Sequence, residues 1–158
     1  MFDGTQHFGS TRMRCPHCCE IKKRNGEAHY YHQLLAGVWA KPGSPYVIPF
    51  SPEPILRQDG QKQNDCEREA AKRFFKRLRA DFPTRRFAAV GDALFVTEPH
   101  LNLLKSLNIH FVNVVKQGDH PYLFEYVDQA FRERRTQELA WVNEEKSFAV
   151  FALSTRFL

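Results

Sequence analysis

The chain has 158 residues, of which 42% are hydrophobic, so it can form one folded domain with a sizeable core and is not expected to be intrinsically disordered. It contains no apolar run of about eighteen residues, and its N-terminus lacks a basic segment followed by an apolar one, so we expect neither a membrane span nor a signal peptide. The net charge of +5 favours an acidic partner such as DNA or RNA.

Strand-forming residues dominate the N-terminal third of the chain. Three strands are predicted, at residues 2–8, 28–39 and 46–50. Asp3 lies in the first strand, and Asn25-Gly26 is typical of the hairpin turn that would precede the second. Residues 53–63 are rich in Pro, Gly and Gln and predict a loop. The pattern therefore indicates an antiparallel meander of three strands.

A basic helix is predicted after this loop. It should begin near Asn64, which has the spacing of a capping box with Glu67, and end before Pro83. Five apolar residues recur at helical spacing and form one face, namely Ala70, Ala71, Phe74, Phe75 and Leu78. The candidate DNA-binding residues lie on the remaining surface and are Lys72, Arg73, Lys76 and Arg77. They are placed to contact phosphates, although such a run of charges is also typical of a solvated helix face.

The next segment has the pattern of a strand, a helix and a second strand. Residues 87–90 form a short apolar run that is typical of a strand buried on both faces, and residues 109–115 predict another. Thr97 can cap the helix between them. Such a βαβ unit has parallel strands. Asp92 directly follows the first strand, at the end of an α/β sheet where ligands and chemistry collect.

The C-terminal part is predicted to contain one more helix. Asp119 can cap it. Its apolar face would consist of Leu123, Phe124, Val127, Ala130 and Phe131. We expect residues 1–138 to form a single domain and residues 139–158 to form an irregular tail, with a strand near residues 148–153 as its one regular element.

Asp3 and Asp92 are the first candidate site. Three antiparallel strands, a helix and then parallel strands is the order of a ribonuclease-H-like fold, in which the first strand and the strand at 87–90 are neighbours. Two carboxylates there would repel each other unless a cation lies between them. Mg²⁺ or Mn²⁺ binds carboxylate and phosphate oxygens, and a pair of such ions can activate the attacking oxygen of a phosphodiester reaction. The alternative is that Asp3 is a turn residue and Asp92 only precedes a helix.

Cys15 and Cys18 are the second candidate site. Their Cys-Pro-x-Cys spacing, followed by a turn, suits half of a zinc site. His29, His32 or Cys66 could complete it. The sequence has no second pair of this spacing, and the alternative is a pair of reduced thiols in a polar loop.

Eight short motifs recur in the order of one known family. They are Asp3-Gly4-Thr5, the Cys15 to Cys18 loop, Tyr30-Tyr31-His32-Gln33, Pro52-Glu53-Pro54-Ile55, Gln58-Asp59-Gly60, Asn64-Asp65-Cys66-Glu67-Arg68, Ala71-Lys72-Arg73 and Gly91-Asp92-Ala93-Leu94. On these motifs the chain resembles bacterial insertion-sequence transposases of the DDE class over residues 2–142. The resemblance implies an α/β fold with a ribonuclease-H-like mixed sheet flanked by helices and incomplete at both ends.

The resemblance also implies a function and a site. Asp3 and Asp92 match the family's first two catalytic carboxylates, which use Mg²⁺ or Mn²⁺ to cut DNA ends and join them to a target. The third, a Glu on a later helix, matches no residue here, since Glu144 and Glu145 follow a different local pattern. The chain therefore resembles a truncated transposase with impaired activity. DNA, self-association and the bacterial cytoplasm near the nucleoid are the implied partners and location.

Two other functions stay open. One is a catalytically inactive DNA-binding module that competes with full-length transposase, and it predicts DNA binding without metal-dependent cutting. The other is an RNA-processing nuclease on the same fold, which would cleave RNA hybrids.

Overall fold

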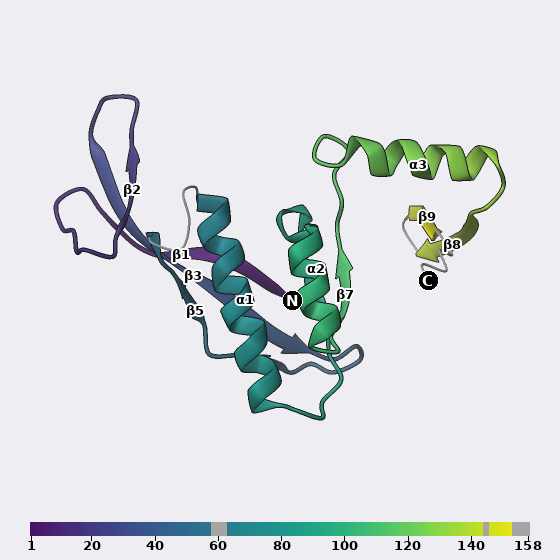
Figure 1. Ribbon diagram of the computed structural model, residues 1–158, viewed down its shortest axis with the longest axis horizontal. Helices are drawn as coiled ribbons and strands as arrows, with labels where there is room; N and C mark the ends of the chain where they lie inside the picture. Colours follow the sequence, from purple (N-terminus) through teal and green to yellow (C-terminus); the bar gives the residue numbers. More distant parts are fainter. Residues whose placement is uncertain (58–62, 144–145, 153–158) are drawn as a thin grey trace. The chain divides into compact units, whose positions relative to one another are not determined.

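The computed structural model describes residues 1–57, 63–143 and 146–152, with side chains described for residues 1–57 and 66–136. The chain divides into two compact units, Met1–Val114 and Val115–Leu158. The first unit contains the antiparallel sheet, two helices and a parallel strand pair that are labelled in Figure 1. The mixed α/β class predicted from the sequence is confirmed.

A five-stranded antiparallel sheet is built around one long central strand. Its members are β1 (Phe2–Ser10), β2 (Cys19–Lys22), β3 (Ala28–Ala40), β4 (Val47–Pro49) and β5 (Glu53–Ile55). Because β3 pairs with each of the other four, the arrangement is not a simple meander (Figure 1). The three predicted strands are confirmed as β1, β3 and β4.

The loop predicted for residues 53–63 is wrong over its first residues, which form β5. Glu53 and Ile55 are buried while Pro54 between them is exposed, the alternation expected of a strand with one covered face. Tertiary contact with a helix therefore overrides the turn-forming composition of this segment. The hairpin turn at Asn25-Gly26 is confirmed, since Gly26 has φ +81° and donates its N–H to the Lys23 carbonyl at 2.9 Å.

Helix α1 (Gln63–Asp81) covers the sheet with the apolar face that its sequence predicts. All five residues of that face are buried, and they join Phe2 of β1, Leu35 of β3 and Ile55 of β5 in one core. The approach is so close at Gly37 that a Cβ there would overlap the Phe74 ring. A glycine in β3 is thus required for space, because its backbone is that of an ordinary strand.

Strands β6 (Ala88–Gly91) and β7 (His110–Asn113) are joined by helix α2 (Glu98–Ser106). They pair in parallel, with Ala88 opposite His110, so the predicted βαβ unit is confirmed. Strand β1 contacts β6, but in the described residues β6 and β7 form a hydrogen-bonded pair separate from the five-stranded sheet.

The two parallel strands are not buried on both faces, and that prediction is wrong. Ala89 packs into the core formed with α1 and α2, whereas Val90 is 40% exposed and Val112 is 63% exposed. Within the described part of this unit, the helical core residues gather on the Ala89 side. An apolar run of four residues cannot reveal which of its faces the fold leaves uncovered.

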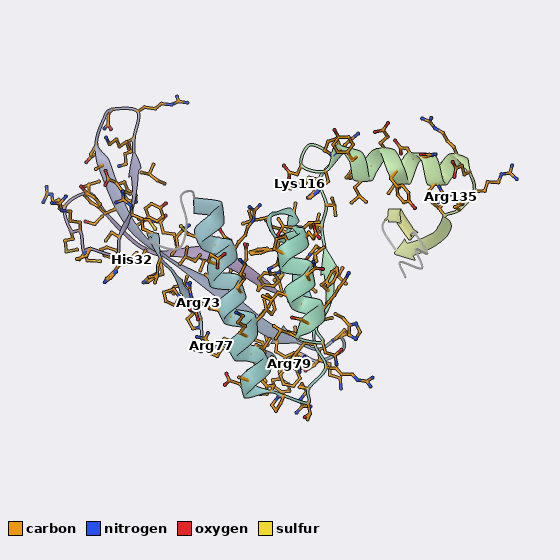
Figure 2. The ribbon with its side chains drawn as sticks, viewed as in Figure 1. His32, Arg73, Arg77, Arg79, Lys116 and Arg135 are labelled. Atoms are coloured by element: carbon orange, nitrogen blue, oxygen red, sulfur yellow. The ribbon has the colours of Figure 1, made fainter. Side chains whose placement is uncertain are left out.

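Arg79 fastens the end of α1 to the βαβ unit. Its Nε donates to the Leu107 carbonyl at 2.7 Å, and its Nη2 donates to the Asn108 carbonyl at 2.9 Å. Its Nη1 donates to the Arg85 carbonyl at 2.9 Å, so one guanidinium holds two loop segments (Figure 2). Carbonyl oxygens left over at helix ends commonly need such donors.

The second unit contains α3 (Pro121–Arg132) and an antiparallel hairpin of β8 (Gln137–Asn143) and β9 (Lys146–Ala152). His120 rather than Asp119 is the N-cap of α3, so the predicted cap is wrong. Of the predicted apolar face, Ala130 is buried but Phe131 is 54% exposed. The hairpin occupies most of the segment expected to be irregular, while the domain boundary at residue 138 stays a prediction. No helix in the described residues is both long and apolar enough to cross a membrane.

Candidate functional site

Asp3 and Asp92 both belong to the first unit, but the strands beside them, β1 and β6, are in separate sheets. Asp3 lies in β1 opposite Ala36, and its Oδ1 accepts the Gly4 N–H at 2.8 Å. Asp92 directly follows β6 and caps the short 3-10 turn η2 (Ala93–Phe95), where its Oδ1 accepts the Leu94 N–H at 3.0 Å. Both side chains are exposed, and β1 contacts β6. Each of the two carboxylates is therefore held by a local backbone hydrogen bond.

Glu67 of α1 is a third carboxylate beside this pair. It is only 8% exposed, and a Cβ on Gly4 would lie 2.6 Å from its Cδ. Burial raises the pKa of Glu67, and the negative charges of Asp3 and Asp92 raise it further, while the Gly4 N–H opposes them. The acidic site, defined as Asp3, Glu67 and Asp92, thus draws one carboxylate from each of three elements.

The sequence pattern around Glu67 predicted a capping box, and the role of Glu67 in the acidic site was missed. A signal was present, because Glu67 lies three and four residues before Ala70 and Ala71 and so continues the buried stripe of α1. A carboxylate in line with a buried stripe is unusual, since Glu is almost never fully buried without a partner.

The thiol–imidazole site, defined as Cys15, Cys18 and His32, is more tightly assembled. Cys15 Sγ and Cys18 Sγ each lie 3.3 Å from His32 Nε2, and the two sulfurs are 3.5 Å apart. Among the described residues, this is the one group of three or more His, Cys, Asp or Glu side chains whose ligand atoms all lie within 4.8 Å of one another. It could hold a metal ion, whereas the ligand atoms of the acidic site do not all lie within 4.8 Å of one another.

The other sulfur ligand considered, Cys66, lies outside this group. Its thiol is buried and donates to the Arg57 carbonyl at 3.7 Å. His29 is also unsuited, because it lies an odd number of residues from His32 in β3 and so projects from the opposite face.

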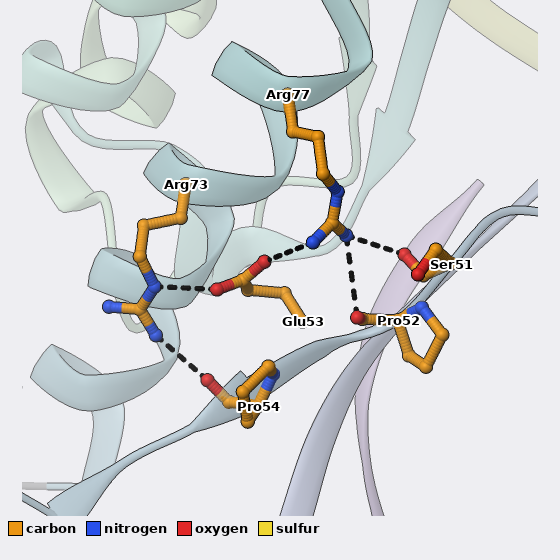
Figure 3. A network of polar contacts seen from close by, with 6 residues as sticks. All are labelled: Ser51, Pro52, Glu53, Pro54, Arg73 and Arg77. Carbon is orange, nitrogen blue, oxygen red and sulfur yellow. Dashed lines mark hydrogen bonds and ion pairs between the residues drawn. The ribbon is translucent and has the colours of Figure 1, made fainter. Parts of the chain in front are cut away.

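The basic residues of α1 are engaged largely within the protein. Arg73 Nε and Arg77 Nη1 each lie 2.7 Å from a different oxygen of Glu53, as Figure 3 shows. Arg73 also donates to the Pro54 carbonyl at 2.8 Å, and Arg77 to the Ser51 carbonyl at 2.6 Å. These contacts fix β5 to α1. A role for them in DNA binding stays a prediction.

The two lysines of the same predicted set differ from the arginines. Lys72 forms an ion pair with Glu69 one turn away, and Lys76 is exposed. Other residues considered from the sequence lie outside the described ones, namely the Gln58-Asp59-Gly60 motif, Glu144 and Glu145. No protein-family model, no curated protein and no solved structure matches this chain.

Proposed function

We propose that this chain carries part of a DDE transposase core, with Asp3 and Asp92 as its catalytic carboxylates. The observation that carries the proposal is that the buried Glu67 carboxyl group lies against Gly4, next to Asp3, where the negative charges of Asp3 and Asp92 raise its pKa. Carboxylates gathered in one region repel one another, and a divalent cation would relieve that repulsion. The order of antiparallel strands, α1 and a parallel pair, with β1 in contact with β6, supports a ribonuclease-H-like arrangement.

The donor set suits a hard cation. Carboxylate oxygens are ligands that Mg²⁺ and Mn²⁺ prefer, so the ligand atoms of the acidic site match such an ion. Asp3 and Asp92 would hold the ion, and Glu67 would add negative charge from the α1 side. When bound, the ion polarises a phosphodiester and its attacking water or hydroxyl. The protein's own part is to orient the two aspartates through the amides of Gly4 and Leu94.

The family's third catalytic carboxylate, a Glu on a later helix, matches no residue of this chain, and this supports impaired chemistry. In-line displacement needs ions held at a fixed separation, and a displacement of about 1 Å can lower a rate about a hundredfold. We therefore expect DNA binding, little cleavage and no joining of DNA ends. The cytoplasm near the nucleoid and self-association on DNA belong to the same proposal.

The test compares Asp92→Asn with Asp119→Asn, an exposed aspartate of the second unit. Calorimetric titration with Mn²⁺ should show weak binding to the wild type and to Asp119→Asn, and loss of most binding in Asp92→Asn. The wild type and Asp119→Asn should slowly nick supercoiled DNA in the presence of Mn²⁺, and Asp92→Asn should not. Equal Mn²⁺ affinity in all three proteins would contradict the proposal, and efficient joined product would contradict the impairment.

The second candidate function is a catalytically inactive DNA-binding module. The tip of the β2–β3 hairpin favours it, because Lys22, Lys23 and Arg24 are consecutive and exposed. Replacing all three with alanine should weaken DNA binding and flatten its salt dependence. Binding with no metal-dependent nicking would favour the module over the transposase, and cleavage confined to RNA–DNA hybrids would favour an RNA-processing nuclease.

For the thiol–imidazole site we propose zinc. Thiolate and imidazole are softer ligands than carboxylate and favour Zn²⁺ over Mg²⁺. The support is that Cys15, Cys18 and His32 already lie within 3.5 Å of one another.

A further inference from the structure

A β-bulge in β1 lies opposite His32. The register pairs Gln6 with Gln33 and Phe8 with His32, so one residue of β1, His7, is extra. Two residues of β1 therefore oppose one residue of β3, and the rings of His7 and Phe8 each lie 5.9 Å from the His32 ring. Bulges of this kind re-aim side chains and are common beside functional sites.

We propose that His7 is the fourth ligand of a closed Cys₂His₂ zinc site formed with Cys15, Cys18 and His32. The inference rests on the zinc identity proposed above and is independent of the chemistry proposed for the acidic site. It assigns the bulge a purpose, because the extra residue brings a second imidazole to the same side of the sheet as His32.

The distances among Cys15, Cys18 and His32 fit one tetrahedral ion. Zinc bonds of about 2.3 Å to sulfur and about 2.0 Å to nitrogen place two ligand sulfurs about 3.8 Å apart and a sulfur and a nitrogen about 3.6 Å apart. The observed separations are 3.5 Å and 3.3 Å, so little movement is needed for a zinc ion to enter. Two imidazoles on one such ion have ring centres roughly 5 Å apart. The ring centres of His7 and His32 are 5.9 Å apart, so the exposed His7 ring would have to move closer to the other three ligands for its nitrogen to reach the same ion.

The surroundings suit a structural metal. One open pocket of about 440 Å³ is lined by all four proposed ligands, together with Phe8, Met13 and Arg14. Backbone amides point at both sulfurs, since the Cys15 N–H donates to Cys18 Sγ at 3.1 Å and the His17 N–H to Cys15 Sγ at 3.4 Å. Such donors stabilise thiolates and fix ligand orientation.

The site would tie three segments together. His7 comes from β1, the two cysteines from the connection between β1 and β2, and His32 from β3. Four protein ligands leave no coordination position for water, so the ion would act as a structural cross-link and not as a hydrolytic centre. It would hold the connection over residues 11–18 against the sheet from which the β2–β3 hairpin projects (Figure 1).

The test uses the full chain freed of metal and titrated with Zn²⁺ against a chromophoric chelator, then with Co²⁺ for its absorption spectrum. The wild type should bind one zinc ion, and its Co²⁺ form should give the intense visible bands of a four-coordinate ion with two thiolates. His7→Ala should weaken zinc binding by tenfold or more. His17→Ala, a matched control on the knuckle itself, should stay within about twofold. His7→Cys should retain tight binding and gain thiolate-to-cobalt charge-transfer absorption.

Each outcome has a distinct meaning. A wild type that binds no zinc overturns the zinc identity itself. Tight binding with unchanged spectra in His7→Ala overturns only the fourth ligand, and a loss confined to His17→Ala transfers that role to His17. Because His7 is exposed, circular dichroism of the metal-free variants should match the wild type.

Discussion

The acidic site and the thiol–imidazole site are assembled in opposite ways. The acidic site takes its carboxylates from β1, α1 and the residue after β6, so it exists only when the whole first unit is packed. The thiol–imidazole site takes two ligands from one short knuckle and a third from the strand beside it. Its sulfur and nitrogen atoms lie within 3.5 Å of one another, whereas the carboxylates repel.

This difference indicates how strongly each site should select its ion. Neutral or weakly acidic ligands can approach one another before a metal arrives, and so the thiol–imidazole site is preorganised. The charges of Asp3 and Asp92 raise the pKa of Glu67, and carboxylates at the acidic site repel until a cation neutralises them. We expect the thiol–imidazole site to bind a soft ion tightly and the acidic site to bind a hard ion weakly.

The largest expected effect is the change in the free energy of unfolding when zinc or Mg²⁺ is added to the metal-free protein. Zinc present at a thousand times its dissociation constant should stabilise the protein by about 4 kcal/mol, and Mg²⁺ near its dissociation constant by only about 0.4 kcal/mol. Urea unfolding with zinc, with Mg²⁺ and with a chelator measures both. Comparable stabilisation by the two ions would remove the contrast between the sites.

The next largest effect is the pH dependence of stability that His100 of α2 should cause. His100 is 1% exposed among Phe2, Phe75 and Phe95, and neither ring nitrogen has a hydrogen-bond partner in the described residues. Burial, followed by the positive charges of Lys72 and Arg68, lowers the pKa of His100 from 6.5 to about 4.

The folded state therefore binds this proton less tightly than the unfolded state. Stability should fall as the pH drops from about 6.5 to about 4, with a total loss of about 3 kcal/mol from His100. Urea unfolding of His100→Phe should lose this part of the decline, while His110→Gln, at an exposed position of β7, should keep it. An unchanged pH profile in His100→Phe would show that other groups cause the decline.

A smaller effect is expected at the ion pairs that hold α1, and with it Glu67, over the sheet. Glu53→Gln leaves Arg73 and Arg77 without their carboxylate and should cost about 2 kcal/mol, less than for a fully buried pair because the two arginine side chains are 37% and 38% exposed. Glu69→Gln breaks the more exposed pair with Lys72 and should cost under about 0.5 kcal/mol. Thermal unfolding of both variants checks the ranking. Equal losses would mean that Glu53 is no more important to α1 than a surface residue.

The smallest effect sharpens the view of the acidic site. Because the pKa of Glu67 is raised, its favourable contribution is present below its unfolded pKa and is lost as the pH rises through the folded value. Glu67→Gln should therefore stabilise the protein at pH 7 by on the order of 1 kcal/mol and have little effect near pH 4. Added Mn²⁺ should shrink the gain at pH 7 if the ion binds beside Glu67. Destabilisation by this substitution at pH 7 would contradict the repulsion that we infer.

Local patterns predicted the elements that carry a regular apolar stripe or an uninterrupted apolar run. The apolar stripe of α1 and the apolar runs at β6 and β7 were sufficient for the helix and for the parallel pair. The strand β5 was missed because three residues carry no period, and Glu53 is buried only through its pairing with arginines twenty or more residues away.

The site residues also differ in whether local sequence patterns could predict them. Cys15, Cys18 and His32 could be proposed from residue type and spacing, and Cys66 could not be rejected without coordinates. Glu67 and His7 were missed for physical reasons. The first depends on how α1 crosses β1, and the second depends on a bulge, which adds one residue without any mark in the sequence.

The close approach of Gly4 to Glu67 has a consequence for how these two positions can vary. Gly4 lies in an ordinary strand, so it is required for the volume that the Glu67 carboxyl group occupies and not for its backbone freedom. Substitutions at the two positions should be coupled, because Gly4→Ala requires the Glu67 carboxyl group to move away or residue 67 to become shorter. A double-mutant cycle of Gly4→Ala and Glu67→Ala should give an interaction energy well away from zero. Related chains that enlarge position 4 should carry a smaller side chain at position 67.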